Sequence, residues 1–343
     1  MRKVMEDQNQ RNRASFSAER RSVSARVASA LLCLVAVAVL VAVSRPTAAR
    51  SAEPDPVIAA VGDIACQSLS QGNGQGACRS DEIADLVTGL GPDRFLPLGD
   101  IQYQNGTTRE FERVYDVQFG HLKPITMPAP GNHEYGTDGA QGYFDYFGPV
   151  SNPPTGYYSF DLGAWHIVSL NSEICGDEPG CGPGSPQYEW LKTDLAENEV
   201  ACTLAVQHHP RYDWRPFQKW IDDEGQISNS GSETAPYVDL WDLMDASGVD
   251  VLLVGHNHIY QRWAPQDGDG VRDPNGVTQF TVGTGGRSLY PFGPKPRPAN
   301  LVATQNKAFG VLQMTLHDTS YEFSWVGLPG DPAFGDAGTR SCV

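Results

Sequence analysis

Short apolar runs recur along the chain, and each ends in a polar or glycine-containing loop. Such runs, bounded by turn residues, are typical of strands that are buried on both faces of a sheet. The pattern therefore predicts strands at residues 57–63, 95–100, 166–171, 203–209, 251–258 and 280–286.

Amphipathic stretches alternate with these runs and predict helices. The first covers residues 79–90 with Ser80 as its N-cap, the second follows Ser185 with Pro186 at its first position, and the third covers residues 236–248. Strands that alternate with helices indicate a layered α/β domain.

The segments between these elements are rich in Gly, Asp and Ser and are expected to form loops around a site: residues 67–77, 213–233 and 264–276. No repeat, linker or break in composition follows residue 53. We therefore expect residues 53–343 to form a single domain.

The first 49 residues have a different character. Several arginines precede an apolar run from Val27 to Val43, which only Ser29 interrupts, and small residues end the segment at Ala49. This order is typical of a secretory signal peptide cleaved after Ala49. The run is also nearly long enough to span a bilayer, so an uncleaved N-terminal signal anchor is the alternative. Both interpretations predict a secreted or extracytoplasmic protein of the cell envelope.

Cysteine usage agrees with export. One cysteine lies in the leader, and the even number that remains suits disulfides in an oxidising compartment. Short Gly-rich loops separate the two cysteines of each of two pairs, and the third pair would then attach the end of the chain. Free buried thiols are the alternative. The predicted disulfides are Cys66–Cys78, Cys175–Cys181 and Cys202–Cys342.

The chain is acidic, with a formal net charge of −16. The Arg-rich leader lowers the magnitude of this value, so the segment after it is more acidic still. Such a surface repels polyanions, which argues against nucleic acid as a partner and restricts membrane contact to an uncleaved leader. Bound cations would be needed to attract an anionic substrate.

Polar side chains with nitrogen or oxygen donors follow the predicted strands. Because ligands of α/β proteins bind beyond the carboxyl ends of the strands, we expect these groups to converge. Five of the eight histidines belong to this set. Its members are Asp63, Asp100, Asn132, His133, His208, His209, His256 and His258.

Any one of these residues alone is more simply explained by helix capping or by a hydrogen bond in the core. Together these residues are more numerous than structural roles at one sheet edge require, because each costs free energy if it is buried without a partner. Donors of this kind without cysteine favour Zn²⁺, Mn²⁺ or iron. The set, with Tyr103, exceeds the needs of one ion, so two ions with a bridging carboxylate are predicted. Two-metal sites suit in-line displacement at phosphorus, which indicates phosphoester hydrolysis.

The motifs "GD" at 62–63, "GDIQY" at 99–103, "GNHE" at 131–134, "HHPRY" at 208–212 and "GHNH" at 255–258 resemble, in order and spacing, those of calcineurin-like metallophosphoesterases. Within that superfamily, "GDIQY" and "GHNHIYQR" are similar to the GDxxY and GHxHxYxR motifs of purple acid phosphatases. The Cys-bearing tail resembles a secreted bacterial branch of those enzymes. The resemblance covers most of residues 57–342 and implies a four-layer α/β/β/α sandwich with two central mixed β-sheets.

The resemblance also implies a ligand set and a pair of metal ions. Fe(III) would occupy the Tyr103 site, and Fe(II), Zn(II) or Mn(II) would occupy the second site. Asp100 would bridge the two ions, and a metal-bound hydroxide would attack phosphorus. The first ion would be held by Asp63, Asp100, Tyr103 and His258, and the second by Asp100, Asn132, His208 and His256.

His133 would be the catalytic general acid, or a contact to the phosphate. A VxxH count from Val206 selects His209 as the fourth-motif ligand, whereas the H-x-P-x-Y register selects His208, which we prefer. His209 is then expected beside the site. Glu134 is expected either to orient His133 or to face solvent, and Arg262 either to neutralise phosphate or to brace its loop by pairing with a carboxylate.

Two departures from the family pattern concern regions around the ligands. The first motif reads "GDIA" where these phosphatases have GDxG, which leaves the ligand Asp63 in place. The segment "DWRPFQKW" at 213–220 stands where some relatives carry further substrate-contacting histidines. Substrate specificity therefore does not transfer from the family.

The sequence thus predicts a phosphatase that hydrolyses monoesters of phosphorylated small molecules, of the acid phosphatase type. A phosphodiesterase or nucleotidase is the first alternative, because Tyr212, Trp214, Phe217 and Trp220 could stack a base. A non-catalytic envelope binding module is the second alternative. It has no need of so many convergent metal donors.

Overall fold

The computed structural model describes residues 54–69, 78–176, 180–214, 220–221, 227–228, 235–292 and 296–343. The predicted leader lies outside the described residues, as do parts of the predicted loops at 67–77 and 213–233 and the side chains of Phe217 and Trp220. Residues Pro54–Val343 form one compact unit.

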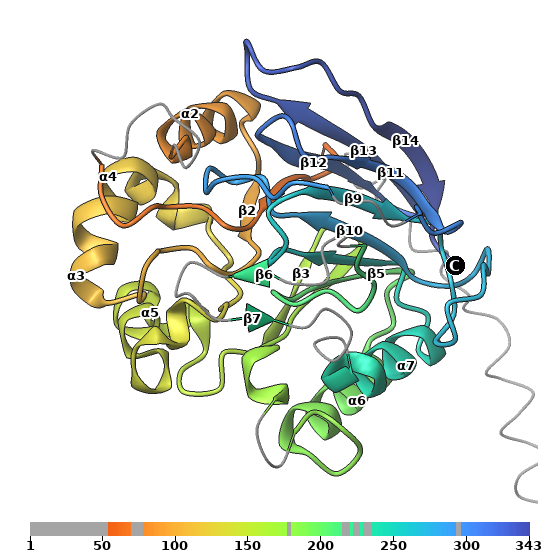
Figure 1. Cartoon of the computed structure of the whole chain (residues 1–343). Coiled ribbons are helices and arrows are strands. Elements are labelled where there is room, and N and C mark those ends of the chain that lie inside the picture. Colours follow the sequence, from red (N-terminus) through yellow and green to blue (C-terminus); the bar gives the residue numbers. More distant parts are fainter. Residues whose placement is uncertain are drawn as a thin grey trace, which may run out of the picture. The chain divides into compact units, whose positions relative to one another are not determined.

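Two mixed β-sheets lie at the centre of this unit (Figure 1). The five-stranded sheet has the order β14-β13-β12-β1-β2 and comprises β1 (Val57–Val61), β2 (Arg94–Pro97), β12 (Gly310–His317), β13 (Ser320–Gly327) and β14 (Ala337–Ser341). The seven-stranded sheet has the order β11-β9-β10-β8-β5-β4-β3 and comprises β3 (Tyr158–Leu162), β4 (Trp165–Ser169), β5 (Cys202–Val206), β8 (Val251–Val254), β9 (Tyr260–Trp263), β10 (Thr278–Val282) and β11 (Leu301–Gln305). A separate pair joins β6 (Trp220–Ile221) to β7 (Ile227–Ser228).

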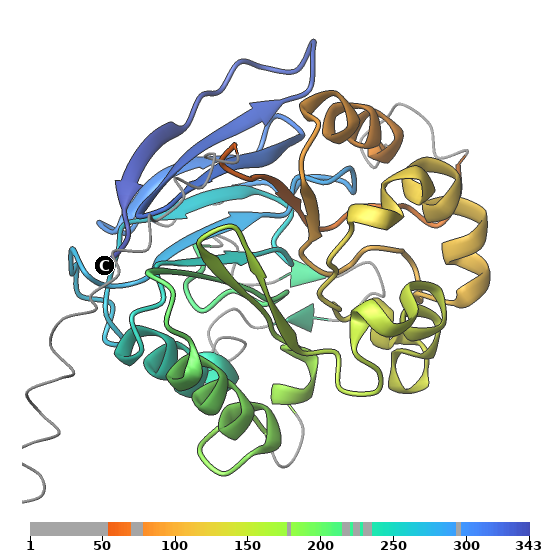
Figure 2. The same ribbon diagram turned by 180° about the vertical axis from the view of Figure 1, so that it is seen from behind.

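Helices flank the two sheets. The α-helices are α2 (Ser80–Leu90), α3 (Thr108–Glu110), α4 (Asp116–Phe119), α5 (Gln141–Phe147), α6 (Pro186–Glu197) and α7 (Val238–Ala246). A π-helical turn covers Phe111–Tyr115, and 3₁₀ turns cover Gly120–Ile125, Glu134–Gly136, Asp138–Ala140, Gly148–Ser151, Glu173–Cys175 and Ala235–Tyr237. Figures 1 and 2 show α6 and α7 side by side along one face of the seven-stranded sheet.

The alternation of side chains along the strands explains the layers. On β8, Val251 and Leu253 belong to the core between the two sheets, while Leu252 and Val254 belong to a second core that includes residues of α6 and α7. Phe95 of β2 stacks on Phe119 of α4 with ring centroids 5.9 Å apart, so helices also cover the five-stranded sheet. The predicted four-layer α/β/β/α sandwich is confirmed.

Each predicted strand is present, in somewhat shortened form. Two details of the helices were wrong. Ser80 is the first helical residue rather than the cap, because its hydroxyl donates to the side chain of Gln118 at 2.8 Å. The helix expected from residue 236 begins at Val238, after a 3₁₀ turn, whereas Pro186 does open α6 behind Ser185.

The structure contains the predicted disulfides Cys66–Cys78, Cys175–Cys181 and Cys202–Cys342. The last joins the start of β5 to the end of the chain across 140 positions. In the part of the chain that the structure describes, no helix has the length and apolar character that a membrane crossing requires.

Candidate metal centre

The donors predicted from sequence lie where strands of both sheets end. Asp63 follows β1 and Asp100 follows β2, two parallel neighbours of the five-stranded sheet. His208 follows β5 and His256 follows β8, two parallel neighbours of the seven-stranded sheet. Because the carboxyl ends of both pairs lie close together, residues far apart in the sequence become neighbours.

Three of these residues have a backbone conformation that side chains rarely adopt. The φ angles are 61° at Asp63, 47° at Asp100 and 69° at His256. Each follows a glycine, and at Gly99 a Cβ atom would lie 2.4 Å from Nδ1 of His208. Strain of this kind is typical of functional sites, where the surrounding structure holds a side chain in position.

A first group of donors surrounds the hydroxyl oxygen of Tyr103, which is fully buried. This oxygen lies 3.1 Å from Oδ1 of Asp63, 3.0 Å from Oδ2 of Asp100 and 2.9 Å from Nε2 of His258. His258 Nε2 is also 3.1 Å from Asp63 Oδ1. We call these four residues the first donor group.

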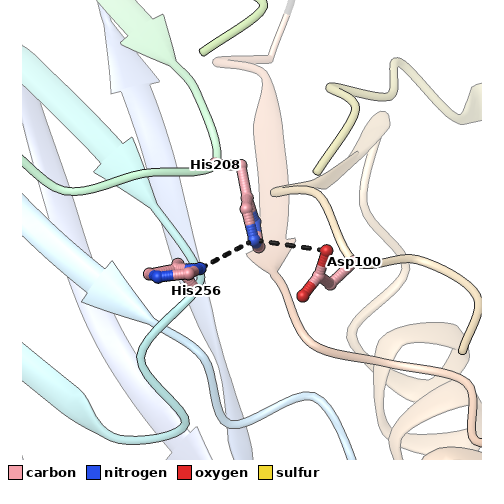
Figure 3. A group of neighbouring side chains, drawn as sticks. All are labelled: Asp100, His208 and His256. Atoms are coloured by element: carbon pink, nitrogen blue, oxygen red, sulfur yellow. Dashed lines mark hydrogen bonds and ion pairs between the residues drawn. The ribbon is translucent and has the colours of Figure 1, made fainter. Parts of the chain in front are cut away.

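A second group surrounds Nε2 of His208. This atom lies 3.3 Å from Oδ1 of Asp100, 3.2 Å from Oδ1 of Asn132 and 3.3 Å from Nδ1 of His256. His256 Nδ1 is in turn 3.2 Å from Asn132 Oδ1. Figure 3 shows the side chains of Asp100, His208 and His256 converging from separate loops. We call these four residues the second donor group, and both groups together the metal centre.

Asp100 belongs to both groups. Its Oδ2 faces Tyr103 of the first group and its Oδ1 faces His208 of the second. The backbone N–H of His133 donates to Oδ1 at 2.9 Å and fixes the carboxylate. One oxygen for each group is the arrangement that a carboxylate shared by two cations requires.

Backbone carbonyls set the tautomers of two histidines. Nδ1 of His208 lies 2.8 Å from the carbonyl oxygen of Leu98, and Nδ1 of His258 lies 2.7 Å from that of Ser288. A carbonyl only accepts, so each Nδ1 carries a hydrogen and Nε2 is the nitrogen that can offer a lone pair to a metal ion. This is the orientation of a histidine metal ligand.

The metal centre has too few hydrogens for its acceptors, which fits a bound cation. Oδ2 of Asp63 is buried and has no hydrogen-bond partner. The single hydrogen of the Tyr103 hydroxyl faces two carboxylate oxygens and the lone pair of His258. Buried acceptors without donors cost free energy, and a cation would satisfy them together.

Without a bound metal, the same crowding shifts protonation equilibria. Burial by itself would raise the pKa of Asp100, but the His208 and His133 imidazoles hold that pKa well below its usual range. Burial would lower the pKa of His208, but the Asp100 carboxylate raises it to about 10. Asp100 is thus ionised and available to bind a cation.

Residues 56–260 match the calcineurin-like phosphoesterase family. The chain belongs to this family. All seven predicted metal ligands lie within the matched residues. The resemblance inferred from the motifs is therefore confirmed at the level of the family.

Purple acid phosphatases are among the curated relatives of this phosphoesterase. The chain is 26% identical over 241 residues to purple acid phosphatase 15 of Arabidopsis thaliana, covering 60% of the chain and 42% of that protein. It is 28% identical over 246 residues to human acid phosphatase type 7, covering 63% of the chain and 54% of that protein. The chain thus spans about half the length, or less, of these relatives.

Solved structures support the fold. The purple acid phosphatase PPD1 of yellow lupin superposes with a TM-score of 0.65 at 20% identity, over 83% of the chain and 53% of the lupin protein. GAP50, described as the anchor in the inner membrane complex of Plasmodium, superposes with a TM-score of 0.57 at 10% identity, over 85% of the chain and 90% of that protein. The fold is thus shared with proteins whose names describe different roles.

Glu134 braces the metal centre from behind. It is fully buried, so the expectation that it faces solvent was wrong, and its oxygens bind backbone N–H groups. Its carboxylate accepts from the backbone N–H groups of Ile101 and Gln102 at 2.9 and 3.1 Å, and from that of Gly131 at 2.8 Å. Burial, together with the Asp100 charge, raises the pKa of Glu134 to about 8.

His133 lies at the edge of the first donor group. Its Nδ1 donates to the carbonyl of Gln104 at 2.5 Å, and its Nε2 lies 3.8 Å from Oδ2 of Asp100. The ring packs on Tyr103 with centroids 4.1 Å apart and is 8% exposed. The imidazole is therefore fixed through one nitrogen while the other faces the metal centre.

His209 lies beside the second donor group. Its Nδ1 lies 3.0 Å from the hydroxyl of Ser172 and 3.1 Å from Oε1 of Glu173. The ring stacks on Tyr237 and lies 4.2 Å from the ring of His256, centroid to centroid. Its Nδ1 is thus directed away from the second donor group. His209 therefore lies beside the predicted ligands, as expected.

Arg262 does not face the metal centre, so of its two expected roles the contact with phosphate was wrong. Its Nε and one terminal nitrogen each donate to Asp336 at 2.8 Å. Tyr260 donates to the same carboxylate at 2.7 Å, and the guanidinium lies over the ring of Phe323. Arg262 braces the C-terminal tail instead.

The sequence motifs missed the loop 283–290, which follows β10. Its Ser288 accepts from His258, and its Tyr290 stacks on the His258 ring at 4.0 Å. Arg287 lies over the ring of Tyr103. The loop begins with "GTGG", the end of the strand predicted at 280–286, whereas β10 ends at Val282, and this strand-end position was the only sequence signal for a role at the site. It also lies beyond the residues that match the family.

Proposed function

We propose that this protein is a dinuclear metal-dependent phosphatase that hydrolyses phosphate monoesters of small molecules. The observation that carries the proposal is the position of Asp100, whose two oxygens face two separate groups of nitrogen and oxygen donors. Two adjacent cation sites suit displacement at phosphorus. The family match and the relatives named as acid phosphatases support this reaction class.

In this proposal the first donor group holds Fe(III), as expected for a tyrosine ligand, and the second holds Fe(II), Zn(II) or Mn(II). The bound ions would lower the pKa of a water molecule and stabilise the entering and departing oxygens. A visible absorption band in the iron-loaded wild type that is lost in Tyr103→Phe would support iron at this tyrosine. A band of equal strength in the variant would contradict it.

His133 would protonate the oxygen of the leaving group. Its fixed Nδ1–H leaves Nε2, which faces the metal centre, to carry the proton that is transferred. The small exposed fraction of the ring shields this proton from bulk water. We therefore assign His133 as the general acid.

Neither alternative function gains support from the described residues. Tyr212 packs on Trp241 and Trp263, and its hydroxyl donates to the carbonyl of Asp267, so its ring serves to anchor a loop. The ring of Trp214 likewise packs against another aromatic ring, that of Phe292. A nucleotide-stacking surface therefore has no support from these two rings, and a binding module would not require the full donor set.

The leader and the disulfides favour export. We infer that residues 1–49 direct the protein out of the cytoplasm, either as a cleaved signal peptide or as an uncleaved anchor. The three disulfides are compatible with an extracellular location. The acidic charge argues against nucleic acid as a substrate.

A substrate panel tests the proposed reaction. Metal-loaded protein is expected to hydrolyse p-nitrophenyl phosphate and glycerol 2-phosphate faster than bis-p-nitrophenyl phosphate. In His133→Gln, turnover of glycerol 2-phosphate should fall about 100-fold or more, as expected for a lost general acid, with a much smaller loss for p-nitrophenyl phosphate, whose leaving group needs no proton.

Two results would contradict this proposal. The proposed function would be refuted if wild-type protein with two bound metals left both monoesters intact from acid to mildly alkaline pH. Equal losses on the two monoesters in His133→Gln would leave the function in place but remove the acid role of His133.

A further inference from the structure

The loop 283–290 is attached to the first donor group at several points. The N–H of Gly285 donates to the carbonyl of Gly62 at 3.0 Å, and the N–H of Arg287 donates to that of Asp63 at 3.1 Å. Farther along, the N–H of Tyr290 donates to the carbonyl of His258 at 2.9 Å. The loop therefore has a fixed position relative to two of the predicted ligands.

A second anchor lies between these points. The carbonyl of Gly286 accepts from the N–H of Arg79 at 3.0 Å, beside the start of α2. Gly286 has a φ of +130°, and a Cβ there would lie 2.7 Å from the backbone of Ser80, so only glycine allows this close packing. The backbone that carries the next residue, Arg287, is therefore fixed in position.

The side chain of Arg287 lies at the metal centre. Its guanidinium carbon is 5.0 Å from the centre of the Tyr103 ring, whose hydroxyl oxygen belongs to the first donor group. The residue is partly exposed, whereas Tyr103 is fully buried. Its positive charge therefore lies near the first donor group, within the screening length of about 8–10 Å at moderate salt.

Two arginines of the sequence motifs make contacts outside the metal centre. Arg262 pairs with Asp336. Arg211, from "HHPRY", lies over the ring of Tyr212 at 4.7 Å and donates to the carbonyl of Gly268. Neither of these contacts involves a residue of the metal centre.

We infer that Arg287 is a substrate-binding residue, which contacts the phosphate group of the monoester at the first donor group. The inference rests on the proposed function. A guanidinium presents paired N–H donors that match two phosphate oxygens, and binding of this kind costs little reorganisation when the backbone is already fixed. In a chain with a net charge of −16, a local cation also offsets the repulsion of an anionic substrate.

The test compares Arg287→Met and Arg287→Lys with wild-type protein of the full chain, after metal loading. Arg272→Met is the matched control, because Arg272 is exposed and its side chain donates to Asn300 and Ala299, which lie outside the metal centre. KM and kcat for p-nitrophenyl phosphate and the inhibition constant of inorganic phosphate are measured. Metal content and circular dichroism verify that each variant is folded and loaded.

Arg287→Met is expected to raise both KM and the inhibition constant by about 10–100-fold, the factor that a lost charge-assisted hydrogen bond implies, with kcat changed far less. Arg287→Lys should fall between this variant and the wild type, because it keeps the charge but not the paired donors. Arg272→Met should match the wild type.

A KM and an inhibition constant within about twofold of wild type in Arg287→Met would overturn the inference, because a lost contact of this kind should change them more. A loss of kcat and metal content at unchanged KM would also overturn it, because it would assign Arg287 a structural role. If the wild type hydrolyses no monoester, the proposed function fails. Calorimetric binding of inorganic phosphate to the metal-loaded proteins then still tests the contact, and equal affinity in wild type and Arg287→Met would refute it.

Discussion

Two regions of this phosphoesterase concentrate buried polar groups, and they differ in the balance of donors and acceptors. In the C-terminal region, Asp336 accepts from Arg262 and Tyr260, so its charge is paired. At the metal centre, Oδ2 of Asp63 has no partner, and one phenolic hydrogen faces several acceptors. A satisfied cluster stabilises the fold, whereas a cluster that lacks hydrogens indicates a binding site for cations.

The end of the chain shows that proximity alone does not make a metal site. Cys202, Asp250 and Cys342 have potential ligand atoms within 4.8 Å of one another, but the two sulfurs are joined in the disulfide. The oxygens of Asp250 accept from the N–H groups of Thr203 and Val343 at 2.8 Å each.

The largest effect is expected from Asp100→Asn. Replacing one carboxylate oxygen by an amide nitrogen removes the group that faces both donor sets, so metal content and activity should fall together. The loss should exceed the 10–100-fold typical of a partner that only orients a ligand. Elemental analysis and p-nitrophenyl phosphate turnover measure it, and a variant with full metal content would contradict the shared role of Asp100.

Glu134→Gln should have the next largest effect. The amide sets an NH2 group against one of the backbone N–H groups that the two oxygens of Glu134 accept from, so the loops that carry Asp100 and Asn132 lose a brace. Metal affinity should fall about 10–100-fold. A metal titration checks this, and unchanged affinity would show that the loops are held in place without Glu134.

Arg262→Met should affect stability and leave the metal centre intact. It removes two charge-assisted hydrogen bonds and leaves Asp336 with Tyr260 alone, so the free energy of unfolding should fall by about 1–3 kcal/mol. Denaturant unfolding measures the change. A raised KM for p-nitrophenyl phosphate at full stability would reverse the assignment and return Arg262 to the substrate.

The smallest effect concerns pH. Burial raises the pKa of Asp250 to about 6, against its backbone hydrogen bonds and Arg340, which lower it. The folded state therefore holds this proton more tightly than the unfolded state, so the stability that Asp250 contributes falls as pH rises from about 4 to about 6. Denaturant unfolding should show this fall in the wild type and not in Asp250→Asn. Equal pH profiles would contradict it.

The apolar pattern predicted a layered α/β domain and polar residues at its strand ends for a physical reason, whereas the four-layer sandwich was implied by the resemblance of the motifs to the family. Strands buried on both faces leave apolar runs such as 251–254, and parallel strands bring their carboxyl ends together, so Asp63 and His256 were expected to meet. The match of residues 56–260 to the family confirms the class of protein. The roles of the individual ligands remain predictions.

What the sequence could not predict depends on partners that are distant along the chain. Arg262 pairs with Asp336, 74 positions away, and the hydroxyl of Ser80 binds Gln118 instead of capping its helix. Arg287 reaches Tyr103 because glycines at 285 and 286 pack against backbone elsewhere in the fold. Local propensity carries no information on such contacts, which only the folded chain creates.

The central claim is that the metal centre binds two metal ions through a shared Asp100. A titration of metal-stripped wild-type protein with Zn²⁺, read by calorimetry with elemental analysis of the product, tests it most directly. Two equivalents per chain in the wild type and no more than one in Asp100→Asn are predicted. A wild type that saturates at one equivalent, or that binds none, would contradict the account.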